Sequence, residues 1–156
     1  MELPLRLLTV AGLAAALSAC ASAPPTAPVA RPPGTGRLEV TMTGFKSEEG
    51  QARIALYLDG RSWPDGEESL FAATVQPIRD GQAVARFEDV PAGPFAVAVF
   101  HDKDVDGKLD SDLLGIPSED YGFSADARDM FGPPSFEEAR LELAAGESKQ
   151  ITVRVR

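Results

Sequence analysis

The residues best placed to do chemistry lie in one acidic segment, DKDVDGKLDSD, which spans residues 102–112. Its aspartates alternate with other residues, and a glycine follows the third of them, with a leucine two positions further on. Oxygen side chains in this register, with a glycine for the sharp turn, are how a calcium loop wraps its ion. The segment therefore predicts a calcium site, with ligands from Asp102, Asp104, Asp106, the carbonyl of Lys108, and Asp110, a turn at Gly107 and an inward-pointing Leu109.

The segment departs from an EF-hand in two respects. The twelfth position, where an EF-hand carries glutamate, is Leu113, and no helical pattern flanks the loop. We therefore expect an EF-like loop mounted on a strand end, with Asp112 or Glu119 as the remaining ligand. The alternative is a solvated acidic loop, because a close pair of carboxylates in water repels by only about 1 kcal/mol. The register of the glycine and the leucine favours calcium.

The chain's single histidine, His101, directly precedes the acidic segment. It shares its alternate phase with the apolar residues of a predicted strand, so we expect a half-buried, hydrogen-bonded side chain at the strand end. In the alternative interpretation His101 is the base of a hydrolase and works with Asp102 or Glu119. Paired carboxylates for glycoside hydrolysis are disfavoured, since every close pair belongs to the proposed metal loop.

Composition excludes several classes of protein. The chain has 156 residues and a formal net charge of -9, whereas a nucleic-acid partner requires a basic face. One cysteine and one histidine exclude a disulfide framework and the usual Cys/His zinc sites. Hydrophobic residues make up 44% of the chain, which suffices for the packed core of one domain.

The first residues carry the pattern of an export signal. An apolar run over residues 7–17 is too short to span a bilayer, which takes about 20 residues, and suits a signal peptide. It ends in Leu-Ser-Ala before Cys20, which is typical of a lipoprotein signal, so we expect residues 1–19 to be removed and Cys20 to be lipidated. The alternative is an ordinary signal peptide cut after Ala19 or Ala23.

Residues 20–36 are rich in proline, alanine and glycine and predict an extended tether between a lipid anchor and the folded domain. Because Ala21 rather than aspartate follows the cysteine, we expect sorting to the outer membrane in a Gram-negative host. The sequence thus predicts an exported protein anchored to the membrane by lipid on Cys20, facing the periplasm or exposed at the cell surface.

From residue 37 onward, apolar residues recur with period two, and glycine- or proline-containing turns separate the runs. The pattern predicts an all-β domain over residues 37–156, a seven-stranded antiparallel sandwich of Ig-like or transthyretin-like type. Residues 102–135 lack strand patterning but are rich in apolar side chains, so we expect one long ordered insertion that packs on the sandwich before the last two strands. Within it, Ser135 and Glu138 fit a capping box.

Three ordered motifs carry a resemblance. HD at residues 101–102 leads into the acidic loop, GIPSEDYGFS spans residues 115–124, and FGPPSF spans residues 131–136. Together they resemble the bacterial family called domain of unknown function 2141, small exported proteins with a loop of the HDxNxNGKLD type. The resemblance covers most of residues 37–156 and implies the same fold and loop, but it implies no reaction, since the family's activity is unassigned.

These observations lead to two main functional hypotheses. The first is a non-enzymatic, calcium-stabilised envelope lipoprotein that serves as a binding or scaffolding module. In it the ordered loop presents Tyr121, Phe123 and Arg128 to a polysaccharide, to peptidoglycan or to another envelope protein. The second is a periplasmic hydrolase that acts on an envelope polysaccharide or peptide through His101 and neighbouring carboxylates. A third hypothesis is that the domain is a passive spacer.

Overall fold

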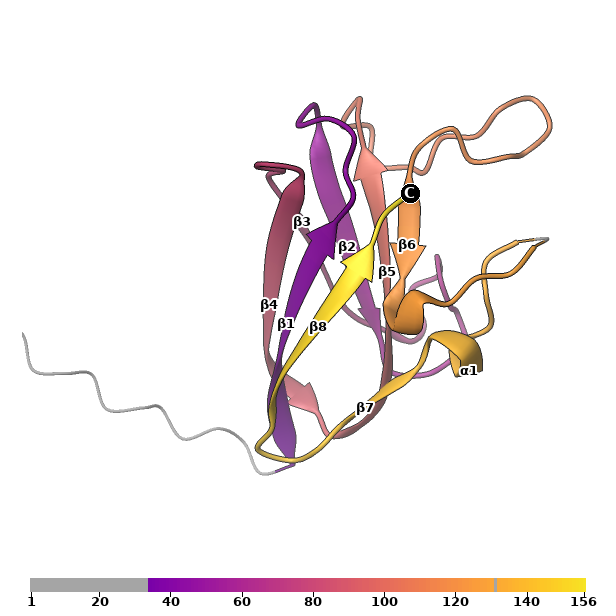
Figure 1. Cartoon of the computed structure of the whole chain (residues 1–156). Helices are drawn as coiled ribbons and strands as arrows, with labels where there is room; N and C mark the ends of the chain where they lie inside the picture. Colours follow the sequence, from indigo (N-terminus) through magenta and orange to yellow (C-terminus); the bar gives the residue numbers. More distant parts are fainter. Residues whose placement is uncertain (1–33, 131) are drawn as a thin grey trace, which may run out of the picture.

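The computed structural model describes residues 34–130 and 132–156, which form two stacked β-sheets (Figure 1). The predicted signal peptide and Cys20 lie outside the described residues. The domain starts slightly earlier than predicted, because Thr35 and Gly36, assigned above to the tether, pair with Pro91 and Val90. No helix in the described ranges is long and apolar enough to cross a membrane.

The two sheets differ in size. The smaller sheet has the order β4-β1-β8, with strands β1 (Thr35–Thr43), β4 (Gln82–Pro91) and β8 (Ser148–Arg154). The larger sheet has the order β3-β2-β5-β6, and β7 pairs with the first residues of β5. Its strands are β2 (Gln51–Tyr57), β3 (Leu70–Gln76), β5 (Gly93–Asp102), β6 (Tyr121–Phe123) and β7 (Leu141–Leu143).

The predicted all-β sandwich is confirmed, with two differences in detail. The described residues form eight strands rather than seven, and the additional strand is β6. It lies inside the interval without strand patterning, because three residues are too few to show a period of two. The sandwich is also not wholly antiparallel, since β1 and β8 pair in parallel.

The apolar residues that recur with period two in the sequence form one layer between the sheets. Alternate side chains of β1, β2, β4 and β5 point inward, and Phe95, Leu38, Ile54 and Leu56 are among the largest that are fully buried. Burial of apolar surface, at about 25 cal/mol per Å², is the main force that holds the sheets together. Among the described residues, every strand pairing and every core side chain lies within residues 35–156, so this part of the chain supplies both sheets and the core between them.

The second half of the long interval packs on the sandwich as predicted. β6 pairs with β5, and the 3-10 helix η1 (Ser124–Asp126) follows it directly. The Ser124 hydroxyl accepts a hydrogen bond from the Val97 N–H (2.9 Å) and donates one to the Ala139 carbonyl (2.5 Å). Ala139 ends the short helix α1 (Phe136–Ala139), whose predicted capping box between Ser135 and Glu138 is present.

Part of the first half of the interval does not pack on the sandwich, contrary to expectation. Residues 109–117 project from the sheets as a hairpin, which appears at the upper right of Figure 1. The predicted inward-pointing residue, Leu109, is 39% exposed. The hairpin is held by backbone bonds within itself, such as that from the Asp112 N–H to the Ile116 carbonyl (2.8 Å), so it needs no apolar anchor.

Candidate metal centre

The centre begins at Asp102, the last residue of β5, whose side chain is fully buried. Its Oδ2 accepts hydrogen bonds from Gln51 Nε2 (2.9 Å), from Arg53 Nε (2.7 Å) and from the Gly107 N–H (3.2 Å). Gln51 and Arg53 lie on β2, which pairs with β5 so that Gln51 stands opposite Asp102. Asp102 Oδ1 is buried too, but it has no hydrogen-bond partner among the described residues.

The neighbours of Asp102 keep it ionised. Burial alone would raise the pKa of this carboxyl group, but hydrogen bonds from Gln51 and Arg53 and the charge of Arg53 outweigh burial and hold the pKa below its usual value. The site therefore presents a buried, negatively charged carboxylate with one oxygen that accepts no hydrogen bond from the described residues. Such a group is costly unless a cation or a water binds it.

The loop after Asp102 brings further carboxylates toward it. The Asp104 Oδ1 accepts from the Asp106 N–H (3.2 Å), and the Asp106 Oδ1 accepts from the Lys108 N–H (2.8 Å), so each aspartate shapes the turn that follows it. Gly107 has a φ of 86°, in the left-handed region that glycine tolerates best, as the sequence predicted. One oxygen each from Asp102, Asp104 and Asp106 lie within 4.8 Å of one another.

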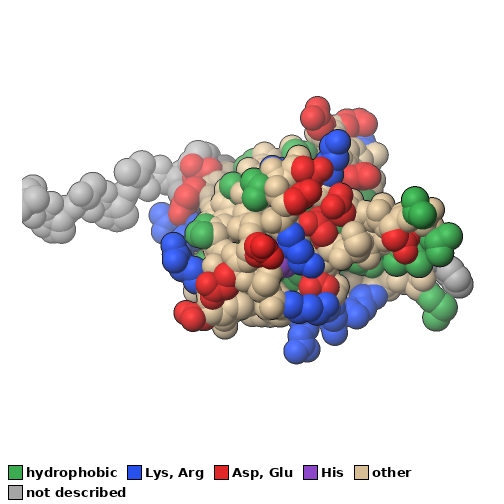
Figure 2. All heavy atoms as spheres, turned by 90° about the horizontal axis from the view of Figure 1, so that it is seen from above, with side chains coloured by type: hydrophobic (Ala, Val, Ile, Leu, Met, Phe, Trp, Pro, Cys, Tyr) green, Lys and Arg blue, Asp and Glu red, His purple; other side chains and the backbone are tan. Residues whose placement is uncertain are grey.

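A second group of carboxylates shares Asp104 with the first. Oxygens of Asp104, Asp110 and Glu119 also lie within 4.8 Å of one another. Glu119 is almost fully buried, and it ties the two ends of the loop together by accepting from the Lys103 N–H (2.7 Å) and the Asp110 N–H (3.2 Å). Desolvation and the charges of Asp104 and Asp106 raise the pKa of Asp110, which records the mutual repulsion in the cluster. Figure 2 shows acidic side chains gathered at this end of the sandwich.

The structure distinguishes between the two residues expected to complete the ligand set. Glu119 lies with the other carboxylates, whereas Asp112 belongs to neither group. The Asp112 Oδ1 instead accepts from the N–H groups of Leu114 (2.8 Å) and Ile116 (3.0 Å) and so closes the projecting hairpin. Lys108, predicted to bind through its carbonyl, contributes its N–H to Asp106.

Carboxylate oxygens are hard ligands, which suit calcium or magnesium rather than soft transition metals. Asp102 belongs to the first group of carboxylates, and its buried Oδ1 has no hydrogen-bond partner among the described residues, so the donor set fits a hard divalent cation. A loop that gathers five carboxylates matches the higher coordination number of calcium better than the strict octahedron of magnesium.

His101 is more deeply buried than expected. Its side chain is 0% exposed, its ring stands edge-on to Phe45 at 5.3 Å between centroids, and its Nε2 donates to the Glu49 carbonyl at 2.7 Å. Nδ1 has no hydrogen-bond partner among the residues that the structure describes. The side chain packs in the sandwich and offers no surface to solvent.

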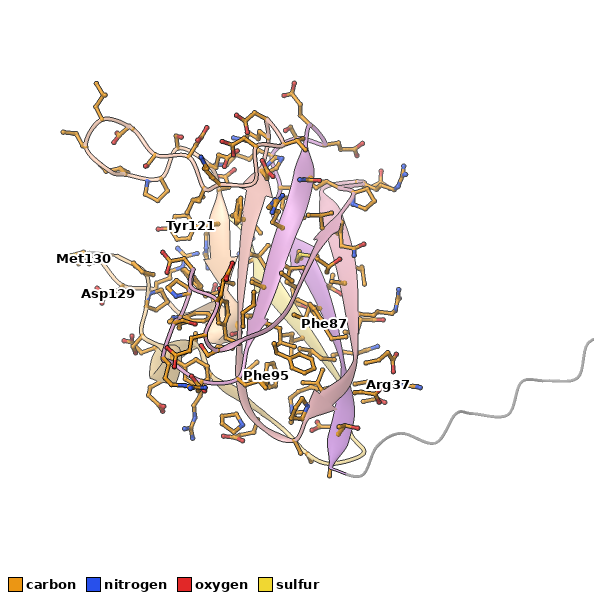
Figure 3. All side chains as sticks on the ribbon, turned by 180° about the vertical axis from the view of Figure 1, so that it is seen from behind. Arg37, Phe87, Phe95, Tyr121, Asp129 and Met130 are labelled. Atoms are coloured by element: carbon orange, nitrogen blue, oxygen red, sulfur yellow. The ribbon has the colours of Figure 1, made fainter. Side chains whose placement is uncertain are left out.

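The three residues predicted to bind a partner meet around one hollow. Tyr121, Phe123 and Arg128 line a depression of about 120 Å³, together with Arg154 and Arg156, which sequence reasoning missed. The Phe123 ring is largely buried and packs on Trp63 at 5.5 Å between centroids. Figure 3 shows the labelled Tyr121 on β6, with Asp129 and Met130 on the loop that borders the hollow.

Comparison with known proteins places the chain in a family. No curated protein and no solved structure matches it. A family model described as "Uncharacterized protein conserved in bacteria (DUF2141)" matches residues 40–152, from β1 through most of β8. The match includes the acidic loop and the projecting hairpin and spans most of the chain, so the protein belongs to the bacterial DUF2141 family.

Proposed function

We propose that this protein is a non-enzymatic, calcium-stabilised binding module of the bacterial envelope, anchored to the membrane through lipid on Cys20. The metal is proposed to bind between Asp102, Asp104 and Asp106, with Asp110 and Glu119 beside them. The anchor rests on the sequence pattern at residues 7–20, and export to the outer membrane is proposed on the same ground.

The observation that carries the calcium proposal is the state of Asp102. The carboxylate is fully buried, a guanidinium and two other donors bind only its Oδ2, and its Oδ1 has no hydrogen-bond partner among the described residues. A solvated acidic loop would expose all of its carboxylates to water. A cation would satisfy the buried oxygen and also relieve the carboxylate repulsion that adds to desolvation in raising the pKa of Asp110.

The absence of an enzymatic role is proposed on the burial of His101. A general base must reach the proton that it removes, directly or through one water. His101 is fully buried against Phe45, and its Nε2 is occupied by a backbone carbonyl. The neighbouring Asp102 is held by Arg53, and Glu119 braces the loop, so the hydrolase alternative has no support from these contacts.

A role in binding is proposed for the hollow beside β6, where Tyr121 and Arg128 offer an aromatic ring and a guanidinium to a saccharide or an envelope protein. The metal loop leads directly into this strand. Glu119 braces the loop, the Asp120 carbonyl accepts from the His101 N–H (2.8 Å), and Tyr121 follows. Calcium would therefore hold the start of β6 in place.

Thermal unfolding of residues 34–156 in calcium, in magnesium and in EDTA tests the proposal. A ligand that binds only the folded state adds about 2.7 kcal/mol at 100 times its dissociation constant. For a domain of this size, we expect a melting temperature several degrees higher in calcium than in EDTA, with a smaller shift in magnesium. Equal melting temperatures in all three, for protein stripped of metal beforehand, would contradict the calcium site.

A further inference from the structure

Three of the exposed large apolar side chains of the described residues lie at the tip of the projecting hairpin. The exposed fractions are 105% for Leu113, 84% for Leu114 and 59% for Ile116. A soluble domain gains nothing by holding three aliphatic side chains together in water, and such clusters mark interaction sites. None of them belongs to either of the two buried apolar clusters of the sandwich.

The hairpin presents these side chains in a fixed arrangement. The Asp112 N–H donates to the Ile116 carbonyl and the Gly115 N–H to the Asp112 carbonyl, while the Ser118 N–H donates to the Asp110 carbonyl. The Asp112 carboxylate accepts hydrogen bonds from the N–H groups of Leu114 and Ile116 and so closes the turn. A partner therefore meets an ordered apolar tip and does not have to order the loop on binding.

A second apolar tip lies on the same side of the molecule. Met130, 86% exposed, stands on the loop that follows η1. Figures 1 and 3 show both loops reaching out from the same edge of the sandwich, and Figure 2 shows apolar side chains at that outer edge. Two separate convex apolar tips on one edge suit a broad, flat apolar medium such as the headgroup boundary of a bilayer.

Cationic side chains lie behind the second tip. Arg128, Arg154 and Arg156 line the hollow that the loop of Met130 borders, against Asp126 and Asp129. Asp126 pairs with Arg156 and lies 3.9 Å from Arg128, whereas Arg154 makes no ion pair within the described part of the chain. Guanidinium groups bind phosphate oxygens strongly, so this edge combines apolar tips with a phosphate-binding group set behind one of them.

We propose that this edge docks on a phospholipid surface, with Leu113, Leu114 and Met130 among the acyl chains and Arg154 at the lipid phosphates. The arrangement is that of interfacial binding, in which apolar groups enter the bilayer only as deep as the headgroup boundary. The inference does not depend on calcium, because none of these residues is a proposed metal ligand.

Sedimentation of residues 34–156 with phosphatidylcholine vesicles tests the proposal, and this form lacks Cys20, so no lipid anchor contributes. We expect the wild-type domain to bind. Replacing both tip residues, Leu113→Glu with Leu114→Glu, should weaken binding about tenfold or more, because charge then replaces buried apolar surface. Arg154→Glu should weaken it as well. The matched control, Phe71→Glu with Val75→Glu, adds the same charge at exposed positions of β3 and should leave binding unchanged.

Two results would overturn lipid docking. One is a wild-type domain that stays in the supernatant, and the other is a tip variant that binds as the wild type does while its melting temperature shows that it is folded. Binding of an acidic oligosaccharide that Arg154→Glu abolishes, without vesicle binding, would overturn it too and assign the hollow to a saccharide. These results do not depend on whether calcium binds, because thermal unfolding in calcium and in EDTA tests the calcium site independently of vesicle binding.

Discussion

Replacing Asp102 by alanine is expected to destabilise the domain by about 3 kcal/mol and to abolish its response to calcium. The change removes a fully buried carboxylate, leaves the donors of Gln51, Arg53 and Gly107 without their acceptor, and opens a small cavity at the end of β5. The figure is at the lower end for a broken buried pair, because the Arg53 side chain is 36% exposed and water can solvate it. Thermal and urea unfolding, with calcium and with EDTA, measure both effects.

Asp112→Ala is the matched control, since it removes the same group from the same loop. The Asp112 carboxylate is exposed and only closes the hairpin. Its loss should cost less than about 1 kcal/mol and leave the calcium response intact. If calcium still stabilises Asp102→Ala but no longer stabilises Asp112→Ala, the ion binds at the hairpin and not at the base of the loop.

The second large effect is expected for Gly50→Ala, although Gly50 carries no functional side chain. A Cβ built on Gly50 would lie 2.1 Å from the Asp102 carbonyl oxygen and 2.6 Å from the Lys103 Cα, and the residue has a φ of +70°. Both atoms are backbone, so the clash is relieved only by moving the start of the acidic loop. We expect a loss of about 3 kcal/mol in unfolding free energy, from strain and displacement together, and weaker calcium binding.

Gly146→Ala separates these two contributions. Gly146 has a similar φ of +78°, but a Cβ there would meet nothing within 4 Å. Its replacement should cost about 1 kcal/mol, the price of the left-handed backbone alone, and should leave calcium binding unchanged. If Gly50→Ala and Gly146→Ala lower the free energy of unfolding equally, the close approach of Gly50 to the loop does not contribute to the destabilisation. Urea unfolding of the two variants decides this.

The sequence was sufficient for those parts of the site that are local. Asp102, Asp104 and Asp106 approach one another because alternate residues around a tight glycine turn converge, and Gly107 has the left-handed φ that this turn requires. The all-β class was equally readable, since strands from both sheets, such as β1, β2 and β4, carry period two. These features depend on neighbours in the chain.

Features that depend on distant segments were not predictable. Arg53 and Gln51 hold Asp102 only because β2 pairs with β5 in a register that leaves no mark on either strand's own sequence. The choice between Asp112 and Glu119 stayed open for the same reason, because Glu119 returns to the loop through the pairing of β6 with β5. Leu109 was misplaced since the hairpin is stabilised by its own hydrogen bonds.

A crystal structure of residues 34–156 grown in calcium chloride would show directly whether calcium binds Asp102, because the proposed site depends on one oxygen atom. We expect a calcium ion with Asp102 Oδ1 at about 2.3–2.6 Å, with oxygens of Asp104 and Asp106 in the same coordination shell. A structure in which Asp102 Oδ1 contacts only water, and the loop carboxylates face solvent without an ion, would contradict it.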